Sequence, residues 1–216
     1  ALVQLAASKG LARIAIHAFT DGRDTSPTSG KGYLDGLQEK LDDIGSGRIA
    51  TISGRYFAMA RDRRWDRTKL AYDAIVHGEG PSAPSANTLF DADYAAGTTD
   101  EFIKPTIIPD ANGQPTTIES GDTVISFNFR SDRMRQLIAA LSETDFDGFD
   151  RGDTPSDLEI VTMTRYEEGL PVVVAFPPKD VTNPVAKVIS DAGMPQFHSA
   201  ETEKYPHVTF FFDGGR

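Results

Sequence analysis

The chain has 216 residues, 39% of them hydrophobic, which is enough for one sizeable core or two small ones. It contains no cysteine, which excludes a disulfide framework and cysteine metal sites and is typical of a reducing compartment, so we expect a cytoplasmic protein. The formal net charge of −10 argues against nucleic acid or an anionic membrane as the main partner, and no apolar run approaches transmembrane length.

The first half of the sequence predicts helices that alternate with strands. Leucines and isoleucines recur at helical spacing between residues 30 and 44, and Thr28-Ser29 offers a cap for the helix they predict. Further along, Asn112-Gly113 separates two short β-prone runs, which predicts a β-hairpin at 107–118. The other elements expected here are helices at 1–9, about 61–76 and 87–97, and strands at 12–19 and 48–52.

The second half continues this alternation. Residues 172–176 are apolar throughout, which is typical of a central strand. We expect further strands at 122–127, 159–163 and 196–200, and helices at 131–141 and 183–192. Strands that alternate with helices predict an α/β fold, here a three-layer sandwich with a mostly parallel sheet flanked by helices, plus the β-hairpin.

An arginine follows the end of each of three predicted strands. Arg23 lies in the motif Asp21-Gly22-Arg23-Asp24, Arg55 follows Ser53-Gly54, and Arg130 and Arg133 follow the third strand. Arg61 opens a further arginine-rich segment. Because parallel strands share one carboxyl edge of a sheet, we expect these five arginines to converge. The result would be a basic pocket on an acidic protein, suited to a small, multiply charged anion.

Simpler interpretations of the same motifs remain open. Arg23 and Asp24 also fit an ordinary surface pair in a turn between a strand and a helix. In residues 61–67, Asp62 and Asp66 are placed to neutralise the arginines locally. We favour a bound anion as the compensating charge, because four arginines at a helix start oppose the macrodipole.

With these motifs assembled, the chain resembles the substrate-binding domain of cofactor-independent (2,3-bisphosphoglycerate-independent) phosphoglycerate mutase. The resemblance implies a two-domain enzyme of the alkaline phosphatase superfamily, whose phosphatase domain carries a nucleophilic serine and two Mn²⁺ ions. Residues 1–216 would be the single substrate-binding domain, excised from that enzyme and lacking the phosphatase domain. The motifs that carry the resemblance are Asp21–Asp24, Ser53–Tyr56, Arg61–Arg67, Tyr72–Gly80, Asn128–Arg133 and Ala200–Phe211.

The resemblance also implies roles for individual residues. Asp24 would be the acid/base, and with Arg23 it would contact the glycerate hydroxyls. Lys204 would reach the transferring phosphoryl group. Ala60 stands where the family commonly has an acid, next to Arg61. The arginines expected to bind substrate phosphate and carboxylate are Arg61, Arg130 and Arg133, with Arg55 as a further substrate arginine; the histidines at 17, 77, 198 and 207 are interpreted as structural, and no metal site is expected in this chain.

The function implied is binding of phosphoglycerate for the interconversion of 3-phosphoglycerate and 2-phosphoglycerate in glycolysis and gluconeogenesis. The partner would be the phosphatase domain of the same polypeptide, which forms the phosphoserine intermediate, so the isolated chain is expected to be inactive. Two alternatives remain open. One is another phosphomutase or phosphatase of the same superfamily, and the other is a non-catalytic module that binds anions or a partner protein.

Overall fold

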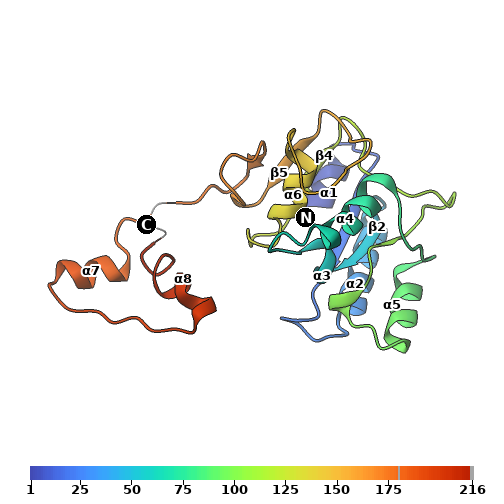
Figure 1. Ribbon diagram of the computed structural model, residues 1–216. Coiled ribbons are helices and arrows are strands. Elements are labelled where there is room, and N and C mark those ends of the chain that lie inside the picture. The colour runs from blue at the N-terminus through green and yellow to red at the C-terminus, as the bar shows by residue number, and fades with distance from the viewer. Residues whose placement is uncertain (180, 215–216) are drawn as a thin grey trace. The chain divides into compact units, whose positions relative to one another are not determined.

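The structure is a computed structural model that describes residues 1–179 and 181–214. The chain divides into two compact units, Ala1–Phe176 and Pro177–Arg216 (Figure 1). The larger unit holds both β-sheets and most of the helices. The smaller unit contains α7 (Val185–Asp191), the 3₁₀ turn η3 (Thr202–Lys204) and α8 (Tyr205–Val208). Whether residues 177–216 belong to the substrate domain stays a prediction.

Helices and short strands alternate along the larger unit, as the sequence pattern predicts. Its helices are α1 (Leu2–Ser8), α2 (Gly30–Ile44), α3 (Arg55–Ala58), α4 (Trp65–Tyr72), the π-helix η1 (Asp73–His77), α5 (Ala86–Ala95), the 3₁₀ turn η2 (Asp100–Phe102) and α6 (Arg135–Ser142). Its strands are β1 (Ala15–Thr20), β2 (Arg48–Gly54), β3 (Thr106–Ile107), β4 (Thr123–Ser126), β5 (Glu159–Thr162) and β6 (Val173–Val174).

The first sheet has the order β1-β2-β3, with β1 parallel to β2 and β3 antiparallel to β2. Its central strand, β2, is buried from residue 49 to 54, as expected of an apolar strand covered on both faces. Because Thr20 is in register with Gly54, the loops that follow β1 and β2 leave the sheet side by side. The core around this sheet includes Leu34 and Leu41 of α2, Phe90 of α5, and Ile49 and Ile52 of β2.

The second sheet, β4-β5-β6, is parallel throughout. Its core joins Ile160 of β5 to Tyr72 at the end of α4 and to Ile138 of α6. Helices α4 and α6 pack against each other, and together they link the two halves of this unit (Figure 1). This packing brings the loop before α6 toward the loop before α4, and both loops carry arginines.

The α/β class is therefore confirmed, but the strands are divided between two sheets instead of one. In the described part of the chain, no backbone ladder joins β1 to β4. A side chain links the two regions instead: Arg13 donates a hydrogen bond of 2.7 Å to the Asp122 carboxylate and one of 3.1 Å to the Thr117 carbonyl.

The prediction of a β-hairpin at 107–118 is wrong for the second strand. The turn forms, and the amide of Asp110 donates to the carbonyl of Gln114. No strand follows, however, because the free edge of β3 is already occupied by residues 81–83: the Ile107 amide donates to Pro81, and the Ala83 amide donates to Ile107. The returning segment pairs with η1 instead, through a bond from the Ile118 amide to the Ile75 carbonyl.

Three further predictions need correction. The apolar run 172–176 forms only the two-residue edge strand β6, where Val173 is exposed. Residues 196–200 form no strand. The helix expected from residue 61 begins only at Trp65, because Asp62 and Arg63 adopt left-handed φ values of 63° and 56° that a helix excludes.

The starts of two helices also differ from the prediction. Helix α6 begins at Arg135 and not at residue 131, and its N-cap is Met134. The side chain of Ser29 makes no capping hydrogen bond at the start of α2. The buried carboxylate of Asp100 accepts instead from the Gly30 amide, at 2.6 Å.

Candidate functional site

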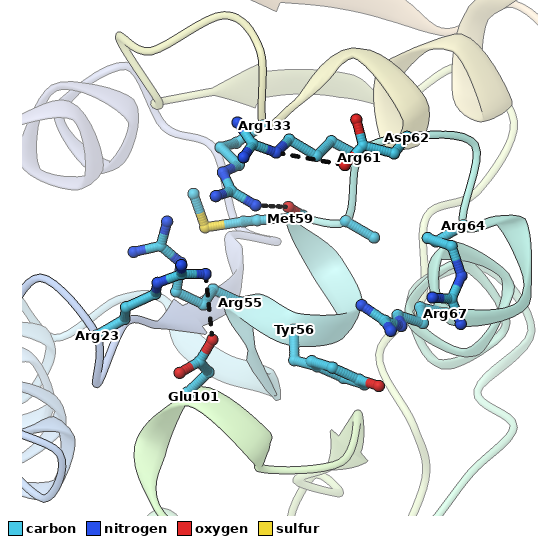
Figure 2. A pocket seen from close by; sticks show the side chains of 11 residues that line it. Arg23, Arg55, Tyr56, Met59, Arg61, Asp62, Arg64, Arg67, Glu101 and Arg133 are labelled. Atoms are coloured by element: carbon cyan, nitrogen blue, oxygen red, sulfur yellow. Dashed lines mark hydrogen bonds and ion pairs between the residues drawn. The ribbon is translucent and has the colours of Figure 1, made fainter. Parts of the chain in front are cut away.

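A pocket of about 260 Å³ lies at the carboxyl ends of β1 and β2 and between the loops that precede α4 and α6. Six arginines line it, against two carboxylates, those of Asp62 and Glu101. Figure 2 shows the guanidinium groups arranged around this space. The lining residues are Arg23, Arg55, Tyr56, Met59, Ala60, Arg61, Asp62, Arg64, Arg67, Glu101 and Arg133.

Arg55 is the buried cation of this pocket, with its side chain only 6% exposed. One of its terminal nitrogens, Nη1, donates to Asp21 Oδ1 at 2.6 Å and to Asp24 Oδ2 at 2.8 Å. Burial by itself lowers the pKa of Arg55, but the hydrogen bonds to Asp24 and Asp21 outweigh burial and raise the pKa. Arg55 therefore stays charged and fixes the loop that follows β1.

Asp21 shapes the loop that carries Arg23 and Asp24. Its Oδ1 accepts from the amides of Arg23 and Asp24, each at 3.1 Å, which makes a local turn. Although burial raises the pKa of Asp21, the hydrogen bonds from Arg55 and from these two amides lower it below its usual value. Asp24 pairs with Arg55 and not with Arg23. The alternative interpretation, a surface ion pair between Arg23 and Asp24, is therefore not what the structure shows.

Asp100 anchors the rim of the pocket, and the sequence analysis did not identify it. This residue is 1% exposed. Its carboxylate accepts from the Gly30 amide and from the Tyr94 hydroxyl, and its carbonyl accepts from the Thr20 hydroxyl at 2.7 Å. It thus ties the end of β1 to the start of α2. The neighbouring Glu101 faces Arg23 across 3.9 Å.

Arg61 and Arg130 share one carboxylate, that of Asp132. Arg130 Nε donates to Asp132 Oδ1 at 2.6 Å, and Arg61 Nη1 lies 3.4 Å from Asp132 Oδ2. Burial raises the pKa of Asp132, but the hydrogen bond from Arg130 and the charges of the nearby arginines lower it overall. Arg130 is 62% exposed and lies beside the pocket, outside its lining as the described residues define it.

Arg133 enters the pocket with little local compensation. Its Nη1 makes a long contact of 3.5 Å with the Met59 carbonyl, and its buried Nε has no hydrogen-bond partner among the described residues (Figure 2). Burial, and then the positive charges of Arg61 and Arg55, lower the pKa of Arg133. Such a guanidinium is a strong position for a bound anion.

Tyr166 holds the loop that carries Arg130 and Arg133, and it too was missed by the sequence analysis. The buried hydroxyl of Tyr166 donates to the Asn128 carbonyl and lies 2.9 Å from the Ser126 hydroxyl. The Tyr166 carbonyl accepts from Arg135 Nε at 2.7 Å. No sequence signal marks this tyrosine, because its partners lie 31 to 40 residues away along the chain.

The remaining predicted site residue is Lys204, which ends η3 in the smaller unit. Its ammonium group lies 3.4 Å from the Glu201 carboxylate. Its approach to the arginine pocket stays a prediction.

Each of the four histidines contacts another residue of the chain. Nδ1 of His17 lies 2.9 Å from the Thr51 hydroxyl, and Nε2 of His77 lies 2.8 Å from the Arg151 carbonyl. His198 and His207 pack against Phe212 and Phe211, respectively.

Among residues 1–179 and 181–214, no three histidine, aspartate or glutamate side chains group closely enough to hold a metal ion. Within the same ranges, no helix has both the length and the apolar character needed to cross a bilayer.

An α/β fold with arginines gathered at the ends of parallel strands defines a class of protein, an α/β domain with a basic pocket. Comparison with known proteins then gives the family. Residues 1–168 match the family model described as "BPG-independent PGAM N-terminus (iPGM_N)", and the chain belongs to this family.

Named relatives agree with this assignment. The chain is 57% identical over 218 residues to the 2,3-bisphosphoglycerate-independent phosphoglycerate mutase of Thermomicrobium roseum, covering 100% of this chain and 42% of the relative. It is 51% identical over 237 residues to the enzyme of the same name from Chloroflexus aurantiacus, covering 100% of this chain and 44% of the relative. The chain thus spans about two fifths of the length of these curated relatives.

The fold also matches a solved structure. A crystal structure of Leishmania mexicana phosphoglycerate mutase at low cobalt concentration superposes with a TM-score of 0.82 at 32% sequence identity. The match covers 99% of this chain and 41% of that one.

Proposed function

We propose that this chain binds phosphoglycerate, as the substrate-binding part of a longer enzyme that interconverts 3-phosphoglycerate and 2-phosphoglycerate. The observation that carries the proposal is the gathering of Arg23, Arg55, Arg61 and Arg133 around one pocket in a member of this family. Guanidinium groups match carboxylate and phosphate oxygens in geometry as well as charge. A substrate with both groups therefore suits a pocket with several arginines.

The roles of the individual residues are those that resemblance to the family implies. Arg61, Arg130 and Arg133 would hold the phosphate and the carboxylate. Asp24 would serve as the acid/base for whichever hydroxyl attacks, because its carboxylate is 65% exposed while Arg55 fixes its orientation. Arg23 would contact the glycerate hydroxyls beside it.

The phosphoryl transfer itself would take place with the rest of the polypeptide. We expect a phosphatase domain there that provides a nucleophilic serine and two Mn²⁺ ions, with phosphoserine as the intermediate. Moving the phosphoryl group between two hydroxyls requires the glycerate to be held while it reorients, and the arginine pocket would supply that hold. Lys204 would reach the transferring phosphoryl group. We further propose that the enzyme is cytoplasmic.

The first test is a titration of 3-phosphoglycerate into the chain, followed by amide NMR at low salt. Saturable shifts should cluster at residues 21–25, 55–64 and 130–133. An Arg130→Ala variant should weaken binding about tenfold or more, since it removes one charge-assisted contact. The matched control is Arg63→Gln, which removes an exposed arginine that is not part of the pocket lining.

Each outcome decides between the functions considered. No saturable shift at millimolar ligand contradicts binding by this chain alone. A preference for another phosphorylated compound favours a different phosphomutase or phosphatase. We expect no mutase turnover from the chain by itself and turnover when the polypeptide includes the remaining domain. Binding without turnover in that longer polypeptide would favour a non-catalytic module.

A further inference from the structure

Two arginines of the pocket have no role in the function proposed above. Arg64 and Arg67 are three residues apart at the start of α4, so they share one face of the helix. Figure 2 shows them together on one side of the pocket, with Arg23 and Arg55 on the opposite side. This side of the pocket is therefore a separate cluster of positive charge.

Arg67 is held in place by an aromatic ring. Its guanidinium carbon lies 3.7 Å from the centroid of Tyr56, a cation–π contact. Tyr56 is itself packed against Phe57 and Phe102, at centroid distances of 5.1 and 5.2 Å. Stacking occupies a face of the guanidinium and leaves the N–H donors at its edge available. Arg67 is thus oriented before any ligand arrives.

Arg67 forms no ion pair within the described part of the chain. Four of the arginines that line the pocket, Arg23, Arg55, Arg61 and Arg64, each have a carboxylate within 4.0 Å. For Arg67 and Arg133 no carboxylate lies that close, among the same residues.

Arg67 and Arg133 share a second feature. In both side chains Nε is buried and lacks a hydrogen-bond partner within the described ranges. A guanidinium that has lost part of its hydration and has no counter-ion attracts an anion more strongly than an exposed one does. The pocket therefore offers two such positions, and only the one at Arg133 has been assigned to phosphoglycerate.

We propose that Arg67, with Arg64 beside it, forms a second oxyanion subsite of the pocket, which binds inorganic phosphate or the phosphate group of a small phosphorylated compound. Arg67 supplies an oriented charge that has no ion pair among the described residues. Arg64, whose side chain is 49% exposed and 3.2 Å from Asp66, supplies further donors at the open side. The subsite does not depend on phosphoglycerate being the substrate.

The probe is inorganic phosphate, and the signal is the side-chain Nε–H resonance of each arginine in ¹⁵N NMR of the full chain. Burial of Nε in Arg67 should slow exchange of its proton with water and make the resonance visible. Phosphate should shift this resonance saturably. Sodium chloride at matched ionic strength, and glycerate, which has no phosphate group, should not reproduce the shift.

Three variants make the assignment specific. Arg67→Gln should weaken phosphate binding about tenfold, and Arg64→Gln, at a more exposed position, about threefold. Arg63→Gln should leave it unchanged, because Arg63 is exposed on the same segment but does not line the pocket. If Arg67→Gln fails to fold, the response of the Arg67 resonance in the wild-type chain and the Arg64→Gln variant still decide the question.

An Arg133→Gln variant separates this subsite from the phosphoglycerate site. The Arg67 resonance should still respond to phosphate in that variant, while binding of 3-phosphoglycerate weakens. The proposal of a second subsite is wrong if phosphate shifts only the Nε–H resonances of the arginines at 61, 130 and 133. It is also wrong if the Arg67→Gln variant binds phosphate with the affinity of the wild type. A failed titration with 3-phosphoglycerate alone would count against the proposed function and not against the subsite.

Discussion

At the scale of single residues, Arg55 illustrates how one buried cation organises a loop. Two carboxylates, Asp21 and Asp24, converge on one of its nitrogens. Both carboxylates are partly open to solvent, while the guanidinium is almost fully enclosed. Removing the guanidinium therefore leaves two acids facing each other around an empty space.

We expect Arg55→Gln to lower the free energy of unfolding by about 2 kcal/mol, because it removes two charge-assisted hydrogen bonds of a buried group. Chemical denaturation with urea measures this loss. Arg63→Gln is the control and should change stability by less than about 0.5 kcal/mol, as is usual for an exposed side chain. Equal stability of the two variants would contradict the role given to Arg55.

His17 makes stability depend on pH. Its side chain lies in β1 against Thr51, and burial, followed by the charges of Arg13 and Arg48, lowers its pKa from 6.5 to about 4. The unfolded chain then binds the proton more tightly than the folded one does. Stability should be unaffected by this group above pH 6.5 and should fall as the pH drops from 6.5 to 4.

The expected slope over that interval approaches 1.4 kcal/mol per pH unit, the free energy equivalent to one unit of pKa shift. Urea denaturation at a series of pH values measures the slope. A His17→Gln variant should lose this component of the slope while keeping the contribution of the carboxylates. An unchanged slope in the variant would show that His17 is not responsible.

At the scale of secondary-structure elements, η2 packs closely against the loops that follow β1 and β2. The backbone of Glu101 approaches Gly54 so closely that a Cβ there would lie 2.3 Å from the Glu101 carbonyl oxygen. A Cβ at Gly30, at the start of α2, would lie 2.8 Å from Asp100 Oδ1. The glycine before Arg55 therefore sets where that arginine enters the pocket.

We expect Gly54→Ala to destabilise the chain by about 2 kcal/mol or more, since a backbone atom and not a flexible side chain must move. Gly36→Ala is the matched control. Nothing lies within 4 Å of its Cβ position in the middle of α2, so the same substitution should stabilise the chain by about 0.5–1 kcal/mol. Thermal unfolding of both variants tests the prediction, and a loss of stability only in Gly36→Ala would overturn it.

At the scale of the whole molecule, the basic pocket stands out against a net charge of −10. The arginines create a local positive field that the rest of the surface opposes at longer range. Salt screens charges separated by more than about 8 Å at physiological ionic strength, so it weakens both contributions. We expect contacts inside the pocket to dominate the binding of an anion.

We therefore expect affinity for 3-phosphoglycerate to fall several-fold between about 0.01 M and 0.15 M sodium chloride. Calorimetric titrations at a series of salt concentrations measure this dependence. The Arg130→Ala variant should show a shallower dependence, because it has one charge fewer. Affinity that rises with salt would mean that the net acidic charge, and not the arginine cluster, governs binding.

Much of this architecture was accessible from sequence. Helix α2 has the predicted bounds, since its apolar spacing and flanking glycine agree with one another. The arginines at 23, 55, 61 and 133 were expected to converge, and they line one pocket. Arg23 and Arg55 meet because they follow the parallel strands β1 and β2 at one edge of the first sheet. Arg133 follows β4 of the second sheet and reaches the pocket through the packing of α4 against α6, which the sequence pattern did not predict.

Other features depended on the tertiary structure alone. Asp100 replaces Ser29 as the cap of α2, Tyr166 fixes the loop before α6, and residues 81–83 occupy the edge where a hairpin strand was expected. Each of these contacts joins segments that are far apart along the chain. The sequence by itself determined the local periodicity, the turns and the residues that carry charge. Only the tertiary structure decided which distant backbone group, carboxylate or ring each turn, helix end or charged side chain contacts. These contacts depend on which surfaces pack together and on which hydrogen-bonding groups would otherwise stay unsatisfied.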